Sequence, residues 1–172
     1  MARCEVRDGD REEVARFIER HWNSRIVMSG GKAFQPHLEE GFLERRGTEI
    51  VGLLTYHIDE RGMEILTLNS TLEGQGIGSS LMLSAIDRAR ERECEKIWIT
   101  TTNDRLRVID FHQRVGFRMM RINLGVVDEA RAIKPQIPLV GERGVPIHDE
   151  IVLELEIEPY LDTPGSDGND FV

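Results

Sequence analysis

The chain has 172 residues, a formal net charge of −9 and a pI of about 5.1. This length suits one domain, and its basic residues are scattered rather than gathered into a stripe, so neither nucleic acid nor an anionic membrane is expected as a partner. The sequence shows no signal-peptide pattern and no apolar run long enough to cross a bilayer, which predicts a cytoplasmic protein. The negative charge would favour a cationic ligand.

The first elements predicted are a short strand at residues 4–7 and a helix at residues 11–22. Val14, Phe17, Ile18 and Trp22 recur at the spacing of one helical face, so we expect that face to be buried. Residues 24–34 are predicted to form a loop, and the pattern of residues 37–43 is ambiguous.

A β-hairpin is predicted next. Residues 49–58 are almost continuously apolar, and Asp59-Glu60-Arg61-Gly62 is a turn sequence that leads into residues 63–69. We expect these two strands to be central in a sheet.

The most informative segment follows this hairpin. Gly74, Gly76 and Gly78 alternate immediately before an amphipathic helix. Glycine allows a tight turn and a close approach of backbone N–H groups to a ligand, and the start of the helix adds unpaired amides and the positive end of its dipole. A phosphate group fits such a loop, although glycines at this spacing are also compatible with an ordinary turn between a strand and a helix.

Two nucleotide motifs do not fit this loop. A Walker loop requires Gly-Lys-Ser/Thr, and no Lys follows these glycines. A dinucleotide fingerprint requires a glycine at the sixth position, which is Ser79 here. The helix after the loop has its apolar positions on one stripe, and these are Ile77, Leu81, Met82, Ile86, Ala85 and Ala89.

The second half of the chain continues the alternation. Residues 96–102 predict a strand, Asn103 is placed to cap a helix at residues 104–115, and Gly116 is expected to end that helix. Another strand begins at Phe117. Residues 150–157 alternate apolar residues with mostly glutamates, so this last strand is expected to have one face in solvent.

A long insertion separates the last two predicted strands. It covers residues 125–149, with a short helical piece near residues 127–134 and three prolines at positions 135, 138 and 146. Insertions of this length often have a function, although a merely structural cover is an equal alternative. We predict one domain over residues 1–160 and a disordered tail over residues 161–172.

The cysteines and histidines predict no metal site and no disulfide framework. Cys4 and Cys94 are far apart and lack a CxxC pattern, so Cys94 is expected to be an ordinary buried thiol. The histidines at positions 21, 37, 57, 112 and 148 show no metal-ligand spacing.

Three segments together resemble the core of the GNAT superfamily of acyl-CoA-dependent N-acyltransferases. They are Glu73-Gly74-Gln75-Gly76-Ile77-Gly78, the TTND sequence at residues 101–104, and FHQRVGF at residues 111–117. The resemblance covers residues 49–117 well and implies an α+β fold with a mixed, mostly antiparallel central sheet flanked by helices. It implies transfer of an acetyl group from acetyl-CoA to a primary amine by direct attack in a ternary complex.

The resemblance also implies a set of contacts with the cofactor. Backbone amides of Gly74, Gln75, Gly76, Ile77, Gly78 and Ser79 would hold the pyrophosphate, and the main chain of Leu66, Thr67 and Leu68 would run beside the pantetheine arm. Glu73 stands where the family usually has Arg or Gln, so we expect it to face solvent. Arg105 stands where the family often has Asn, and it is a candidate for a CoA phosphate together with Asn103.

Two residues are candidates for catalysis. An alkylamine with a pKa near ~10.4 is mostly protonated at pH 7, so a base is useful, and Glu64 resembles the general base of the histone-acetyltransferase branch. His57 is a possible substitute or water relay, and Thr100 occupies a position where some members carry glutamate. His112 takes the place of the tyrosine that many members use, and an imidazole could protonate the leaving thiolate.

Other functional classes stay open. Because Glu73, Arg105 and His112 depart from the usual residues, an acyl-CoA-binding sensor or an inactive relative is an alternative, and a nucleotide-phosphate-binding domain is a third. The residues do not identify the amine, which could belong to a small molecule or to a protein. They also leave the oligomeric state open, although family members are often dimers.

Overall fold

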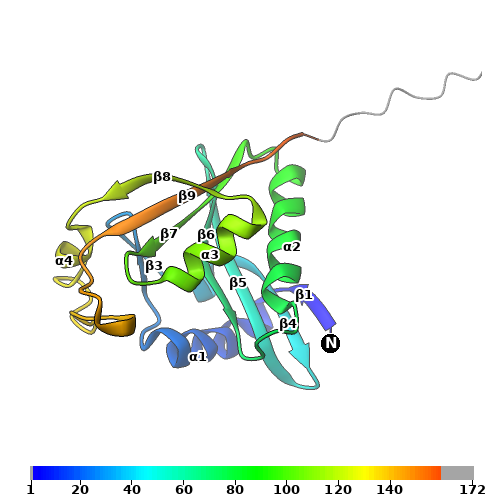
Figure 1. The fold of residues 1–172 in the computed structure, drawn as a ribbon. Helices are drawn as coiled ribbons and strands as arrows, with labels where there is room; N and C mark the ends of the chain where they lie inside the picture. Colours follow the sequence, from blue (N-terminus) through cyan, green and yellow to red (C-terminus); the bar gives the residue numbers. More distant parts are fainter. Residues whose placement is uncertain (1, 160–172) are drawn as a thin grey trace, which may run out of the picture.

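The computed structural model describes residues 2–159, so the predicted tail at residues 161–172 lies outside the described part (Figure 1). The β-strands are β1 Ala2–Glu5, β2 Val27–Ser29, β3 Lys32–Phe34, β4 Glu40–Arg46, β5 Glu49–Asp59, β6 Gly62–Ser70, β7 Lys96–Thr102, β8 Arg118–Asn123 and β9 Glu150–Glu156. The α-helices are α1 Arg11–Trp22, α2 Ile77–Glu91, α3 Leu106–Val115 and α4 Val126–Ala130, and short 3-10 turns cover Asp8–Asp10, Pro36–Leu38 and Glu142–Gly144.

Seven of these strands form one sheet in the order β1-β4-β5-β6-β7-β9-β8. Among the described strands, β6 and β7 are the parallel pair, and every other neighbouring pair in this sheet is antiparallel. The expected mixed, mostly antiparallel sheet is therefore confirmed. The central position of the β5–β6 hairpin is confirmed as well.

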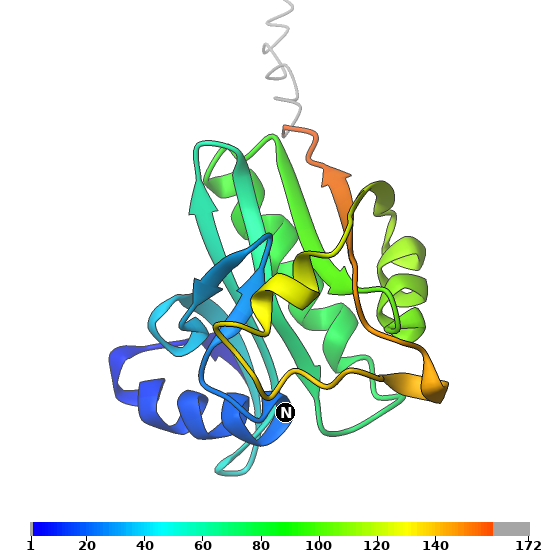
Figure 2. The same cartoon turned by 90° about the vertical axis from the view of Figure 1, so that its left-hand side faces the viewer.

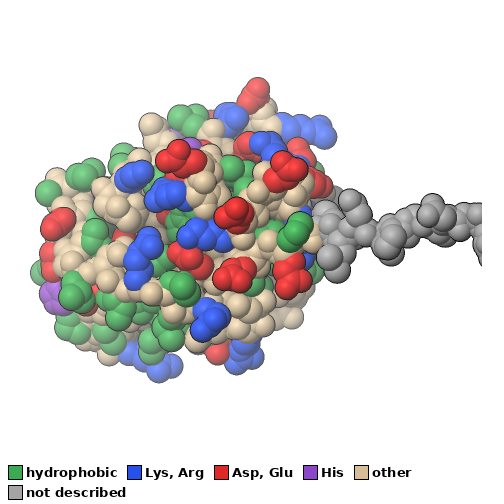
Figure 3. Space-filling view, turned by 90° about the horizontal axis from the view of Figure 1, so that it is seen from above, with side chains coloured by type: hydrophobic (Ala, Val, Ile, Leu, Met, Phe, Trp, Pro, Cys, Tyr) green, Lys and Arg blue, Asp and Glu red, His purple; other side chains and the backbone are tan. Residues whose placement is uncertain are grey.

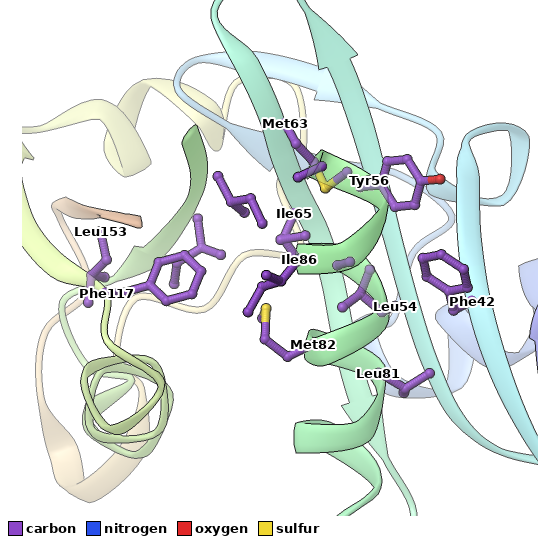
Figure 4. Packing of buried hydrophobic residues seen from close by; sticks show 14 of the residues in the cluster. Phe42, Leu54, Tyr56, Met63, Ile65, Leu81, Met82, Ile86, Phe117 and Leu153 are labelled. Carbon is purple, nitrogen blue, oxygen red and sulfur yellow. The ribbon is translucent and has the colours of Figure 1, made fainter. Parts of the chain in front are cut away.

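Helices cover the two faces of the sheet. Adjacent residues of β5 point to opposite faces of the sheet. Leu53 packs with α1 on one face, whereas Leu54 packs with α2 on the other. Figure 4 shows Met82 and Ile86 of α2 facing Ile65, with Phe117 and Leu153 continuing the same cluster toward α3. All six residues of the predicted α2 stripe are buried, which confirms the pattern seen in the sequence.

The structure corrects the sequence predictions near the N-terminus. The first strand is β1, two residues earlier than expected at its start. The segment predicted as a loop contains the β2–β3 hairpin, whose strands have only three residues each and end around Gly30 and Gly31, both at positive φ. Strands this short carry too little periodicity to be recognised. The ambiguous segment at residues 37–43 divides into a 3-10 turn and the start of β4.

Strand β9 corrects another expectation. Its glutamates were expected on a solvent-exposed face, which holds for Glu156 at the end of the strand. However, β9 lies between β7 and β8, and Glu150 is buried together with Val152. An alternating pattern indicates exposure only when nothing covers the polar face. Here the β2–β3 hairpin, whose Gly30 bonds to Glu150, and the insertion between β8 and β9 together supply a cover.

The cover is visible in Figure 2, where the β2–β3 hairpin and α4 lie in front of the sheet. On the face shown in Figure 3, acidic and basic side chains are interspersed, in keeping with the scattered charges of the sequence. No helix within residues 2–159 is long and apolar enough to cross a membrane. Cys94 is buried and free, as expected.

Candidate active site

Strands β6 and β7 pair only at their starts. The parallel register runs from Met63 to Ile65 on β6, and the pairing with β5 shifts between Thr55 and Tyr56, which leaves Leu66 as an extra, bulged residue. Beyond Ile65 no ladder joins β6 to β7. The β7-facing edge of β6 at Leu66, Thr67 and Leu68 is therefore free to bond a ligand. This is the place where the family resemblance implies the pantetheine arm.

The glycine loop has the conformation that its sequence predicts. Gly74 and Gly76 have φ values of +72° and +73°, and open space surrounds the positions that a Cβ would occupy at both. The first amide of α2 to bond within the helix is that of Ser80, which donates to the Gly76 carbonyl oxygen at 2.9 Å. The amides that precede it at Ile77, Gly78 and Ser79 lack such partners, so the loop can hold an anion.

Glycine is also required under this loop, on β5. A Cβ at Gly52 would collide with the Cγ2 atom of Ile77, and it would come within 3.0 Å of Leu81 Cδ1. The first turn of α2 therefore rests directly on the backbone of β5. This close packing fixes where the loop amides point.

Glu73 faces solvent, as expected, with 91% of its side chain exposed. Its nearest cation is Arg107, whose guanidinium lies 3.9 Å from the carboxylate. Arg107 also borders the cavity between β6 and β7, and it was not among the residues predicted from the sequence. An exposed arginine beside an anion-binding loop is well placed to bind a phosphate. A single charged residue on a helix, however, has no sequence pattern that would identify it in advance.

A cavity of about 750 Å³ opens where β6 and β7 separate. We call one side the strand wall, formed by residues 65–70 of β6, residues 99–102 of β7 and the starts of α2 and α3. We call the other side the insertion wall, formed by β2, Glu150 and the part of the insertion that borders the cavity. The insertion contributes Val127, Ala130, Lys134, Gln136, Ile137, Pro138, Gly141, Glu142 and Ile147.

Glu64 lies just behind the cavity. Its side chain is buried, and Oε1 accepts a hydrogen bond from the Ser29 hydroxyl, which itself borders the cavity. Ser29 ends β2, so the hairpin that the sequence did not predict brings this hydroxyl to the carboxylate. The predicted base therefore reaches the cavity through a serine.

Glu150 is a second carboxylate at the same place, and it was not predicted as a site residue from the sequence. It is 4% exposed and borders the cavity, and its Oε2 accepts a hydrogen bond from the Gly30 amide at 3.1 Å. Burial raises its pKa, and the nearby charge of Glu64 raises it further. Glu150 pairs with Thr102 on β7, two residues from Thr100. Thr100 stands where some family members carry glutamate, so here the neighbouring strand β9 supplies a carboxylate close to that position.

His112 borders the strand wall between two aromatic rings. The ring centroids of Phe111 and Phe117 lie 5.0 and 5.2 Å from that of the imidazole. The Nδ1 atom lies 2.7 Å from the Val108 carbonyl oxygen, which can only accept, so Nδ1 carries a proton. Nε2 is buried without a hydrogen-bond partner among the described residues, and burial lowers the His112 pKa. The neutral ring therefore presents a lone pair at Nε2.

His57 does not border the cavity, although it lies opposite Glu64 in the β5–β6 ladder. Its Nδ1 atom is 3.0 Å from a carboxylate oxygen of Glu39, and its ring lies against Phe34. These contacts hold the imidazole beside β3.

Asn103 has a different role from the expected helix cap. The helix begins at Leu106, and Asn103 instead anchors the insertion. Its side-chain NH₂ donates to the Pro146 carbonyl at 2.8 Å, and its oxygen accepts from the amides of His148 and Asp149, each at 3.1 Å. Both ends of the Asn103 amide are therefore engaged by the insertion. A contact between Asn103 and the cofactor stays a prediction, and these hydrogen bonds do not favour it. Gly116 ends the helix in a left-handed conformation, as expected.

Arg105 borders the cavity and lies over the Trp22 ring, with 5.6 Å from Cζ to the ring centroid. Trp22 in turn donates its indole N–H to the side-chain oxygen of Asn69 on β6 at 2.8 Å. This chain of contacts ties α1 to β6 and to the start of α3. The guanidinium nitrogens remain able to meet a phosphate from that position.

This architecture, a sheet that separates beside a glycine loop and a helix start, defines a class of α+β folds in which an anion-binding loop lies next to a free strand edge. The sequence of residues 5–117 matches the acetyltransferase (GNAT) family. The chain is also 36% identical over 156 residues to the uncharacterised protein YxbD of Bacillus subtilis (strain 168), a match that covers 90% of this chain and 96% of that protein. The chain therefore belongs to the GNAT acetyltransferase family.

Solved structures agree with this assignment. A GNAT family acetyltransferase from Elizabethkingia anophelis with acetyl-CoA bound is 25% identical, with a TM-score of 0.60 over 68% of this chain and 75% of that chain. A Bacillus subtilis acetyltransferase in complex with CoA is 18% identical, with a TM-score of 0.62 over 91% of this chain and 97% of that chain. The second of these similarities concerns the fold alone.

Proposed function

We propose that the protein transfers the acetyl group of acetyl-CoA to a primary amine by direct attack in a ternary complex. One observation carries this proposal: a single cavity is bordered by the unpaired edge of β6, by Gly78 of the glycine loop, and by the Ser29 hydroxyl that bonds to Glu64. The bound acetyl-CoA in the Elizabethkingia structure supports the choice of cofactor.

The strand wall would hold the cofactor. Loop amides from Gly74 to Ser79 would bind the pyrophosphate, and the free edge of β6 at Leu66, Thr67 and Leu68 would bond the pantetheine arm. Arg105 and Arg107 lie at the start of α3 and would meet phosphate oxygens. When bound, acetyl-CoA supplies the electrophilic carbonyl carbon and the leaving thiolate.

Glu64 would remove a proton from the acceptor. An amine in water is mostly ammonium, and it must lose one proton before its lone pair can attack. Ser29 Oγ accepts this proton as its own passes to Glu64 Oε1, so that one proton is transferred in total. Glu150 lies close enough to influence Glu64 and would stabilise the ammonium before it is deprotonated.

His112 would carry the second proton. Formation of the amide bond releases one more proton from the nitrogen, and cleavage of the C–S bond leaves a thiolate that needs one. The lone pair at His112 Nε2 can take the first and return it to sulfur. The imidazole therefore acts as a carrier that starts neutral rather than as an acid that starts protonated, because burial disfavours the charged ring.

Thermal unfolding is the first test of this function. A ligand at 100 times its dissociation constant stabilises the folded state by ~2.7 kcal/mol, so acetyl-CoA and CoA at millimolar concentration should both raise the melting temperature while ATP should not. Release of CoA in the presence of an amine panel then tests turnover. Absence of stabilisation by either CoA species would contradict the proposal, and binding without turnover would favour the acyl-CoA sensor.

A further inference from the structure

The backbone at the two ends of β2 hydrogen-bonds to two side chains of opposite charge. Just before the strand, the Ile26 carbonyl oxygen accepts a hydrogen bond from Lys134 Nζ at 2.9 Å. Just after it, the Gly30 amide donates to Glu150. Lys134 and Glu150 both border the cavity, and β2 runs between them with Val27, Met28 and Ser29 on the wall.

Lys134 is an unusual residue for a cavity wall. It is 8% exposed, and within residues 2–159 no carboxylate lies within 4.0 Å of its ammonium group. One carbonyl oxygen satisfies one of its three donors, so two N–H groups lack a partner within the described part of the chain. Burial lowers its pKa, and no neighbouring carboxylate opposes that effect. A buried cation with this environment gains most from an anion that enters the cavity.

The opposite end of the cavity suits a cation. The Glu150 carboxylate is buried and borders the cavity. Its hydrogen bonds within residues 2–159 all reach Oε2, so Oε1 has no partner in this part of the chain. Glu64 and Ser29 lie beside it. An ammonium group at this end would relieve the repulsion between two buried carboxylates.

We infer that the acceptor carries an anionic group, bound by Lys134, at the far end from its reactive amine, which lies by Glu150 and Ser29. This inference rests on the proposed function. The three residues of β2 separate the Ile26 carbonyl from the Gly30 amide, a span of roughly 10 Å in a strand. The two charges of the acceptor are therefore expected to lie roughly 10 Å apart. Free α-amino acids are too short to make both contacts, whereas an extended peptide of three residues spans about 10 Å.

Oligoglycines provide the probes, because each length is available as a free carboxylate and as a neutral C-terminal amide. Glycine, diglycine, triglycine and tetraglycine are added in both forms to the protein in saturating CoA, and the shift in melting temperature and the rate of acetylation with acetyl-CoA are measured. We expect triglycine to bind about tenfold more tightly than its amide, a ratio that corresponds to ~1.4 kcal/mol. Glycine and glycinamide should not differ.

Lys134→Met should abolish the preference for the carboxylate while leaving binding of CoA unchanged, and Lys134→Arg should retain part of it. Lys32→Met, on the exposed strand β3, is the matched control and should keep the full preference. Equal affinities for acid and amide at every length, no shift with any peptide, or a preference that survives Lys134→Met would overturn the inference. Failure of CoA itself to stabilise the protein would instead overturn the proposed function.

Discussion

The strand wall and the insertion wall of the cavity are built in different ways. The strand wall presents mainly backbone: loop amides, a bulged residue and an unpaired strand edge, all within residues 65–102. The insertion wall presents side chains from segments far apart in the chain: Ser29 of β2, Glu150 of β9 and Lys134 of the insertion. Behind this wall, Ser29 bonds to Glu64 of β6. Backbone recognition suits a ligand shared by a whole family, whereas side chains brought from distant segments can change with the acceptor.

The largest expected effect is on chemistry at the insertion wall. Glu64→Gln removes the acceptor for the proton passed through Ser29, so we expect kcat to fall about 100-fold, within the range for a general base. Because Glu64 does not border the strand wall, the dissociation constant of acetyl-CoA should stay unchanged.

Glu60→Gln, at the exposed β5–β6 turn, is the control and should behave like the wild type. Steady-state kinetics with an accepted amine, together with calorimetric titration of acetyl-CoA, distinguish the two quantities. If Glu64→Gln instead weakened the affinity for acetyl-CoA and left kcat unchanged, the assignment of cofactor binding to the strand wall and of proton transfer to the insertion wall would be wrong.

The second expected effect is on the strand wall and on stability. Gly52→Val places a side chain where Ile77 and Leu81 already lie, and overpacking of this kind costs about 1–3 kcal/mol. The melting temperature should fall by several degrees, and the affinity for acetyl-CoA should fall because α2 must move away from β5. Gly9→Ala is the control, since nothing lies within 4 Å of a Cβ at that position. A variant with unchanged stability and affinity would show that α2 does not depend on this contact.

The third expected effect separates the anchoring role of Asn103 from its predicted role in binding the cofactor. Asn103→Ala removes three hydrogen bonds to the insertion, so we expect a loss of about 1–3 kcal/mol of stability and a severalfold rise in KM for the amine. The KM for acetyl-CoA should not change. Gln113→Ala, at an exposed position on α3, should leave all three quantities unchanged. If KM rose for acetyl-CoA alone, Asn103 would belong to the strand wall.

The smallest expected effect is the pH dependence of stability due to Glu150. Its carboxyl has a raised pKa in the folded protein, whereas in the unfolded protein it titrates near 4.5. Between these two pKa values the folded state therefore binds more protons than the unfolded state. This contribution to stability is therefore present below pH 4.5 and is lost as pH rises through the folded pKa. Glu150→Gln should flatten this part of the profile of melting temperature against pH, whereas Glu156→Gln, at an exposed position, should not. Identical profiles for both variants would contradict the raised pKa of Glu150.

The same division explains what the sequence could predict. The glycine loop, the α2 stripe and the β5–β6 hairpin are local patterns, and the structure has all three where periodicity and turn chemistry place them. The insertion wall depends on contacts between residues far apart in the chain. Ser29 sits on a three-residue strand, and Glu150 looks like a solvent-facing residue until the insertion covers it. No local pattern could place these side chains beside Glu64.

The attachment of the insertion has a consequence for how the site assembles. Asn103 meets His148 across 45 positions of sequence, and closing a loop of that length costs roughly 3 kcal/mol of chain entropy. Contacts of this kind form late in folding and open early under mild denaturant, while the paired strands persist. We expect the amides of residues 142–149 to exchange with solvent faster than those of β7. The cavity would then admit and release its acceptor by local unfolding of one border, with the sheet and the glycine loop intact.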